Sequence, residues 1–205
     1  DARARMQEAI ASHRRSVELV PSSAFAWNNL GGVLQLNGEV IEAERAFQHS
    51  LQLEPSKAAY SNVATAQFLA GKFADAVGNY ERAVELGPHD QTVRGNLADA
   101  LWHLPGRRED AVATYRIAID LAEAELAATP GDPMLSAQLG YYYGRVGDPA
   151  QSKSHLDRAL GAGASLLYVQ YYSSVAALDR GDREVALEAL AAMVRLGYPT
   201  KLLRS

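Results

Sequence analysis

Apolar residues recur along this chain at the spacing of amphipathic helices. Between residues 24 and 56 they stand three and four positions apart in two runs, and Gly38 separates the runs. A run with this period places its apolar side chains on one face of a helix, and glycine permits the tight turn that ends it. The stretch therefore predicts a pair of packed helices joined at Gly38.

The same arrangement returns, with variations, over the rest of the sequence. We delimit a half repeat at 1–23, five repeats at 24–56, 57–90, 91–132, 133–166 and 167–199, and a tail at 200–205. Recurrence at this length indicates helix pairs that bury their apolar faces against their neighbours. The sequence thus predicts an all-α chain of about eleven helices that forms a single solenoid over residues 1–205.

The first full repeat carries a motif of fixed spacing. In order it contains Trp27, Leu30, Gly31, Leu34, Gly38, Ala43, Phe47, Ser50, Leu51 and Pro55. This order resembles the tetratricopeptide repeat, a unit of about 34 residues. The resemblance implies a right-handed α-α superhelix in which Gly31 and Ala43 let paired helices approach closely while Phe47 fills the space between them. It also implies a surface that holds other molecules instead of an active site.

The two ends of the chain depart from the regular pattern. Residues 1–21 match only the second half of the unit. A second helix without its first would leave Ala9 and Val17 on an uncovered apolar face, so we expect the chain to begin inside a repeat of a larger protein. At the other end, Leu202 and Leu203 predict a further short helix within 200–205.

The repeat at 91–132 is longer than the others. Its turn at 104–107 holds one extra residue, and no helix breaker interrupts residues 109–128. The additional helical turns either cover the neighbouring repeat or protrude as a contact for a dimer or another domain. The pattern alone leaves both interpretations open.

Composition and charge argue against several functional classes. The 205 residues carry a net charge of −4, and their Lys and Arg residues form no basic cluster, which disfavours nucleic-acid binding. No apolar run approaches the ~18 residues of a membrane span, so we expect no membrane insertion by this segment. The absence of cysteine excludes disulfides and thiolate metal sites.

Residue patterns typical of catalysis are missing as well. The sequence contains neither a phosphate-binding loop nor a Gly-x-Ser-x-Gly elbow. Its five histidines stand apart, with no partner at metal-ligand spacing. We therefore predict no catalytic residue, no metal and no cofactor.

A row of polar residues marks the candidate binding surface. The position directly before the motif leucine in each first helix holds Asn29, Asn62, Asn96, Gln138 and Tyr172 in turn, and Asn28, Thr65, Phe68, Asp99, Trp102 and Tyr141 extend the same face. By resemblance to the family, first helices line the concave groove of the superhelix. A primary amide both donates and accepts hydrogen bonds, so a row of amides suits the backbone of an extended peptide. If their role is structural, the amides bond neighbouring helices instead.

One known binding mode of the family is not matched. Its carboxylate clamp holds the C-terminus of a chaperone with Lys and Arg. The corresponding positions here are Ala58, Asn62, Thr92 and Asn96. A chaperone tail is therefore disfavoured, and a protein or an extended peptide in the groove is the predicted partner.

A second resemblance concerns the wider context. The run 95–102, the Pro-Gly turn after it, the helix around 117–122 and the closing stretch 186–198 are similar to repeat regions attached to bacterial serine/threonine kinases and nucleotide cyclases. This implies a sensory or scaffolding part of a larger bacterial regulatory protein, cytoplasmic, or periplasmic if attached to a transmembrane kinase. Two alternatives to a peptide-binding scaffold stay open: a self-association module that forms a homodimer, and a small-ligand sensor for a signalling kinase.

Overall fold

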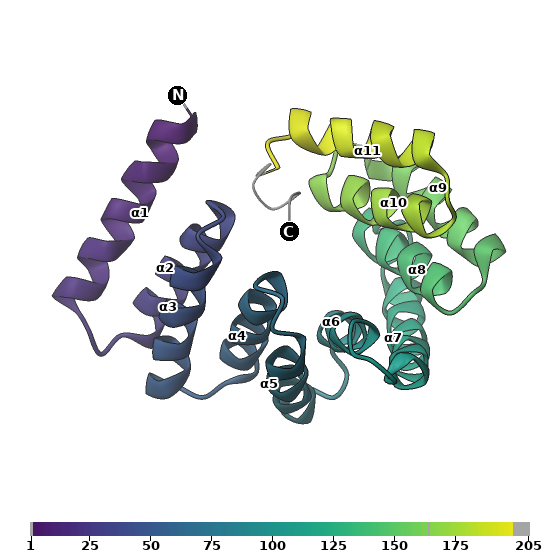
Figure 1. The fold of residues 1–205 in the computed structure, drawn as a ribbon. Coiled ribbons are helices and arrows are strands. Elements are labelled where there is room, and N and C mark those ends of the chain that lie inside the picture. The colour runs from purple at the N-terminus through teal and green to yellow at the C-terminus, as the bar shows by residue number, and fades with distance from the viewer. Residues whose placement is uncertain (1, 164, 199–205) are drawn as a thin grey trace. The chain divides into compact units, whose positions relative to one another are not determined.

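The described part of the chain is built from helices alone. The computed structural model describes residues 2–163 and 165–198, and within them it contains eleven helices and no strand (Figure 1). The helices are α1 (Ala2–Leu19), α2 (Ala24–Leu36), α3 (Val40–Leu53), α4 (Lys57–Leu69), α5 (Phe73–Leu86), α6 (Gln91–Trp102), α7 (Arg108–Ala128), α8 (Pro133–Arg145), α9 (Pro149–Gly163), α10 (Leu167–Asp179) and α11 (Arg183–Arg195). The predicted all-α class and helix number are confirmed.

Local sequence signals set where these helices begin and turn. The side chains of Ser23 and Ser56 accept hydrogen bonds from backbone N–H groups in the first turns of α2 and α4, and thereby satisfy donors that have no partner within the helix. At the turn between α2 and α3, Gly38 has a φ of 78°. Glycine adopts this left-handed conformation without the steric penalty of a Cβ, so the predicted turn at Gly38 is confirmed.

Close approach within each helix pair depends on small residues. A Cβ atom on Gly31 would lie 2.6 Å from the Phe47 ring, and Ala43 is fully buried. The same contact recurs between α8 and α9, where a Cβ on Gly140 would lie 2.6 Å from Leu156. The predicted roles of Gly31, Ala43 and Phe47 are therefore confirmed.

The chain divides into two compact units. Among the described residues, the first unit comprises 2–88 and 99–105, and the second comprises 89–98, 106–163 and 165–198. In the first unit each helix from α1 to α4 packs against the next, and in the second α8 contacts α7, α9 and α10 while α10 contacts α11. The prediction of one continuous solenoid over 1–205, with its repeat boundaries, stays a prediction.

The expectation of an uncovered apolar face on α1 is wrong for Val17. Val17 is 7% exposed and Ile10 is 3% exposed, and both belong to a core cluster with residues of α2. From the repeat pattern, Val17 was expected on the face toward a preceding helix. In the structure Val17 faces the helix that follows.

The long helix α7 covers part of its own unit. Beyond the length of a regular second helix it buries Ala122 and Leu126, and Tyr143 of α8 donates a hydrogen bond to Glu123. These contacts favour the interpretation that the additional turns cover the neighbouring helix pair. The short helix predicted at 200–205 lies outside the described residues.

Two glycines provide a matched test of the helix approach. Gly31 and Gly78 are both helical, but nothing lies within 4 Å of a Cβ at Gly78. We expect Gly31→Ala to lower the free energy of unfolding by about 1–3 kcal/mol through overpacking against Phe47. Gly78→Ala should raise it by roughly 0.5–1 kcal/mol, because alanine favours the helix over glycine. Urea unfolding followed by circular dichroism measures both, and equal shifts would contradict the close approach.

Candidate functional site

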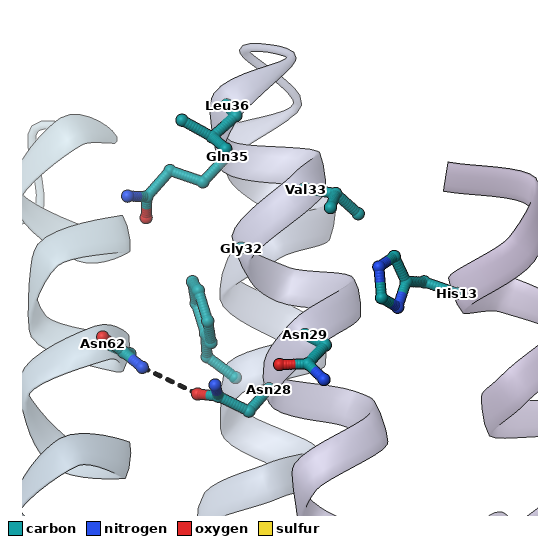
Figure 2. Close-up of a pocket in the computed structure, with 9 residues that line it drawn as sticks. His13, Asn28, Asn29, Gly32, Val33, Gln35, Leu36 and Asn62 are labelled. Atoms are coloured by element: carbon teal, nitrogen blue, oxygen red, sulfur yellow. Dashed lines mark hydrogen bonds between the residues drawn. The ribbon is translucent and has the colours of Figure 1, made fainter. Parts of the chain in front are cut away.

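The first unit contains a cavity lined by amide side chains. Its volume is about 480 Å³, and α2 supplies most of its wall, with contributions from α1, α3 and α4 (Figure 2). The lining residues are His13, Asn28, Asn29, Gly32, Val33, Gln35, Leu36, Phe47 and Asn62. Three of the residues predicted from the sequence, Asn28, Asn29 and Asn62, are thus brought to one place.

Helical periodicity explains how α2 builds this wall. Asn28, Gly32 and Gln35 stand four and three positions apart, so they share one side of the helix. A Cβ on Gly32 would meet nothing within 4 Å, so this position leaves space between its polar neighbours. Gly32 and Gln35 were not predicted as site residues, although their helical spacing from Asn28 places them on the same face.

The amides of the cavity are only partly engaged. Asn62 Nδ2 donates to Asn28 Oδ1 at 2.7 Å, which links α4 to α2 (Figure 2). Gln35 Oε1 is shielded from solvent and accepts no hydrogen bond within the described part of the chain. A buried acceptor without a donor costs about 1–3 kcal/mol, so this oxygen favours a ligand with an N–H or O–H group. The amides that line the cavity can therefore both donate and accept hydrogen bonds.

Formal charge is nearly absent from the cavity wall. Among its lining residues His13 is the ionisable one, and no Lys, Arg, Asp or Glu belongs to the set. Val33, Leu36 and Phe47 add apolar surface. The arrangement suits a neutral ligand that combines polar and apolar groups.

The other predicted residues of the first unit contact the protein itself. Thr65 Oγ1 donates to the carbonyl of Ser61 at 2.9 Å and lies 2.9 Å from the Tyr80 hydroxyl. The ring of Phe68 lies 5.4 Å from that of Phe73 between centroids. Asp99 and Trp102, at the end of α6, are half-buried. Contact of these residues with a ligand stays a prediction.

A second, smaller cavity of the first unit was not predicted. Its volume is about 380 Å³, and it is lined by residues 71–75 and 103–105. Beside it the rings of Phe73 and His103 stack at 4.4 Å between centroids with an angle of 12°. This cavity lies next to the turn at 104–107, which the sequence shows to be one residue longer than the other turns.

In the second unit the predicted amide position is buried. Gln138 is 3% exposed, and its Oε1 accepts a hydrogen bond from Gln91 Nε2 at 3.0 Å while its Nε2 donates to Thr92 Oγ1 at 3.2 Å. The Tyr142 hydroxyl donates to Gln91 Oε1 at 3.2 Å. Burial with these partners gives Gln138 a role in packing α8 against α6.

The predicted tyrosines of the second unit form part of an aromatic cluster. Tyr141 is 4% exposed, and its hydroxyl accepts a hydrogen bond from Arg145 Nε at 3.0 Å. Its ring lies 5.5 Å from that of Tyr172 between centroids, and Tyr172 is half-buried. Asn96 is half-exposed on α6. Ligand contact at these positions, and at Gln138, stays a prediction.

Residues 2–163 and 165–198 hold neither the side-chain cluster of a metal site nor the helix of a membrane span. No group of three His, Asp or Glu side chains in this part of the chain is arranged to hold a metal ion. No described helix combines the length and apolar character needed to cross a bilayer.

One histidine of the second unit is held in an unusual environment. The ring of His155 stacks on that of Tyr143 at 5.5 Å between centroids, and its shielded Nδ1 has no hydrogen-bond partner among the described residues. Burial lowers the pKa of His155, Arg158 lowers it further, and Glu123 opposes the shift. Burial and the bond to Glu123 raise the pKa of Tyr143 to about 12, so the phenol stays neutral.

The lowered pKa of His155 predicts acid destabilisation of this unit. Because the folded state binds the proton less readily than the unfolded state, the stabilisation is present above the unfolded pKa of about 6.5 and is lost as pH falls through that value toward the folded pKa. We expect His155→Phe, which keeps an aromatic ring, to reduce the loss in melting temperature between about pH 7 and pH 5. Thermal unfolding at both values measures this, and an unchanged pH dependence would contradict it.

Comparison with known proteins identifies repeats in the chain. Family models of the tetratricopeptide repeat match residues 22–88 and 64–133, which together span more than half of the sequence. A segment of 60 residues is 37% identical to the protein O-mannosyl-transferase TMTC1 of Homo sapiens. That match covers 29% of this chain and 7% of the transferase.

Solved structures with the same fold are more distant in sequence. YrrB, described as a TPR protein with an unusual peptide-binding site, is 18% identical with a TM-score of 0.53, over 96% of this chain and 98% of its own. TTC0263, described as a thermophilic TPR protein in Thermus thermophilus, is 20% identical with a TM-score of 0.65, over 88% and 100%. The Cut9–Hcn1 complex matches at 17% identity and a TM-score of 0.64, over 97% of this chain and 39% of the other. These likenesses confirm an all-α repeat fold.

Proposed function

The chain belongs to the tetratricopeptide repeat family, and from this premise we propose that the amide-lined cavity of the first unit binds an extended segment of a partner protein. Repeats of this family are generally noncatalytic scaffolds for protein interaction. The proposal adds a location and a kind of ligand to that general role. The observation that carries it is the set of incompletely engaged amides at the cavity.

The chemistry of these amides matches a peptide backbone. Each peptide group offers one N–H donor and one C=O acceptor, and a primary amide complements both. Within the described residues, Gln35 Oε1 lacks a donor and the Asn29 side chain makes no hydrogen bond, so both side chains can bond a ligand without breaking an existing contact. Asn62 and Asn28 are already bonded to each other and hold α4 beside α2. We assign Asn29 and Gln35 to recognition and the Asn28–Asn62 pair to the cavity wall.

The lining also limits which segment is bound. Without Lys or Arg at the wall, a terminal carboxylate or an acidic side chain would lose part of its hydration without gaining an oppositely charged partner. Val33 and Leu36 offer contact for an apolar side chain next to the backbone. The proposed ligand is therefore an internal, uncharged stretch of a protein, a choice that also agrees with the unmatched carboxylate clamp.

The wider role is proposed on resemblance. Similarity to repeats attached to bacterial serine/threonine kinases and nucleotide cyclases supports a sensory or scaffolding part of a larger bacterial regulatory protein. The cavity of about 480 Å³ lies within the range of small-molecule sites, which supports a small-ligand sensor as the second candidate. The sequence of the complete gene product tests the first idea, and a metabolite screen by thermal shift tests the second.

A peptide selection tests the proposed site directly. Peptides that bind the chain are selected from a random displayed library, and their affinity for the parent and for Asn29→Ala/Gln35→Ala is measured by calorimetry. Each lost hydrogen bond is worth about 0.5–1.5 kcal/mol, so the double variant should bind roughly 5- to 160-fold more weakly. Helicity should stay unchanged, since neither amide carries a hydrogen bond of the fold.

The control removes an amide of the same unit outside the cavity. Gln52 is exposed on α3 and does not line the cavity, so Gln52→Ala should keep the parent affinity. Equal affinity of the double variant and the parent, for every selected peptide, would place peptide binding elsewhere. Equal weakening in Gln52→Ala would show that the loss is not specific to the cavity.

A further inference from the structure

The turn between α2 and α3 contains a chemically reactive pair of residues. Asn37 is followed by Gly38, whereas the other asparagines of the chain are followed by Asn, Leu, Val or Tyr. In an Asn-Gly pair no Cβ shields the glycine nitrogen, so this nitrogen can attack the side-chain amide of the asparagine. By sequence, Asn37 is therefore the asparagine most open to deamidation, the loss of its side-chain nitrogen.

Deamidation consumes water and no other reagent. The Gly38 backbone nitrogen loses its proton and bonds to Asn37 Cγ, and the bond from Cγ to the side-chain nitrogen breaks. That nitrogen takes up a proton and leaves as ammonia. Water then opens the five-membered imide ring at one of its two carbonyls. One opening leaves an aspartate, and the other leaves an isoaspartate, in which the main chain runs through the former side chain.

The folded turn occupies the nitrogen that would attack. The Gly38 N–H donates to Gln35 O at 2.9 Å, and the Glu39 N–H donates to Leu34 O at 2.9 Å. These are the two hydrogen bonds of a Schellman motif, which closes the C-terminal end of a helix. Because the Gly38 N–H is engaged, its nitrogen keeps its proton and is a poor nucleophile.

The backbone angle at Asn37 also opposes ring closure. Its ψ is −2°, which sets the Gly38 nitrogen against the backbone nitrogen of Asn37 itself. The Cβ of Asn37 stands about 120° away around the Cα–C bond, and the ring closes only when this angle falls near zero. Such a rotation turns the following chain and breaks both hydrogen bonds of the motif. The side chain is held as well, because Asn37 Nδ2 donates to Glu39 Oε1.

The turn does not require an asparagine. Ala70 holds the corresponding place between α4 and α5, with a φ of −84° and a ψ of 0°, and Asn37 has a φ of −83° and a ψ of −2°. The same two hydrogen bonds close the turn after Ala70. The reactivity of Asn37 is thus separate from the conformation that the turn needs.

We propose that Asn37 is a deamidation site that the closed turn protects, so that its conversion records opening of the α2–α3 pair. The reaction proceeds from the open fraction of the turn, and its rate follows the population of that fraction. Reclosing of the turn does not restore the amide. The product therefore accumulates with the time that the pair has spent open.

Conversion changes the turn itself. An aspartate at position 37 places a negative charge next to the Glu39 carboxylate, at the C-terminal end of α2, where the helix dipole disfavours it. An isoaspartate lengthens the main chain by one carbon and displaces the hydrogen bonds of the motif. Gln35 and Leu36, which line the cavity, directly precede the modified residue. The site thus lies at one end of the cavity wall.

Mass spectrometry of the peptide that contains Asn37 measures the conversion over time at neutral pH. The folded chain should convert at least about tenfold more slowly than the chain unfolded in guanidinium chloride, because few molecules have an open turn at any moment. Asn37→Ala removes the side-chain amide and should show no conversion in this peptide, folded or unfolded.

Two matched glycines test whether the α2–α3 pair controls the rate. A Cβ on Gly31 of α2 would lie 2.6 Å from Phe47, and a Cβ on Gly140 of α8 would lie 2.6 Å from Leu156. Gly31→Ala loosens the α2–α3 pair and should raise the folded-state rate about fivefold or more. Gly140→Ala loosens a pair of the second unit and should leave the rate at the parent value. In guanidinium chloride both variants should match the parent, and circular dichroism checks that both are folded without it.

Three outcomes would overturn the proposal. The first is an unfolded chain in which Asn37 does not convert, and the second is a folded parent that converts as fast as the unfolded one. In the third, Gly31→Ala converts no faster than Gly140→Ala, which would separate the reaction from the opening of the α2–α3 pair.

Discussion

The close approach of paired helices is the constraint on which the structure depends. At Gly31 the α2 backbone lies so near the Phe47 ring that a single added carbon would stand 2.6 Å from it. Gly140 of α8 meets Leu156 of α9 in the same manner. In these two pairs the small residues face the partner helix, and polar residues stand on other sides of the first helices. Asn28 of α2 lines the cavity, and Gln138 of α8 belongs to the buried network.

Identical motif positions therefore serve different purposes in the two units. Asn62 bonds Asn28 at the edge of an open cavity, whereas Gln138 lies within a closed set of hydrogen bonds that includes Gln91 and Tyr142. A buried polar network of this kind is stable only when all its members are paired. The motif amide of the first unit thus lies at a cavity, whereas the motif amide of the second unit packs inside the fold.

The sequence predicted the helices, the turn at Gly38 and the Gly31–Phe47 contact because each follows from local spacing and residue size. It placed Asn28, Asn29 and Asn62 on one surface for the same reason. The burial of Gln138 and Tyr141 depends on contacts with Gln91 and Tyr115, which stand tens of residues away, so no local pattern reveals it. The error at Val17 arose because periodicity gives the width of an apolar face but does not say which neighbour covers each side of it.

The near absence of formal charge around the cavity has a consequence for how a partner would arrive. An uncharged wall exerts no long-range attraction of its own, so it does not itself accelerate association by electrostatic steering. Salt screens interactions between charges, and the wall holds no Lys, Arg, Asp or Glu. The contacts that a ligand makes with the wall itself would therefore keep their strength across a wide range of ionic strength.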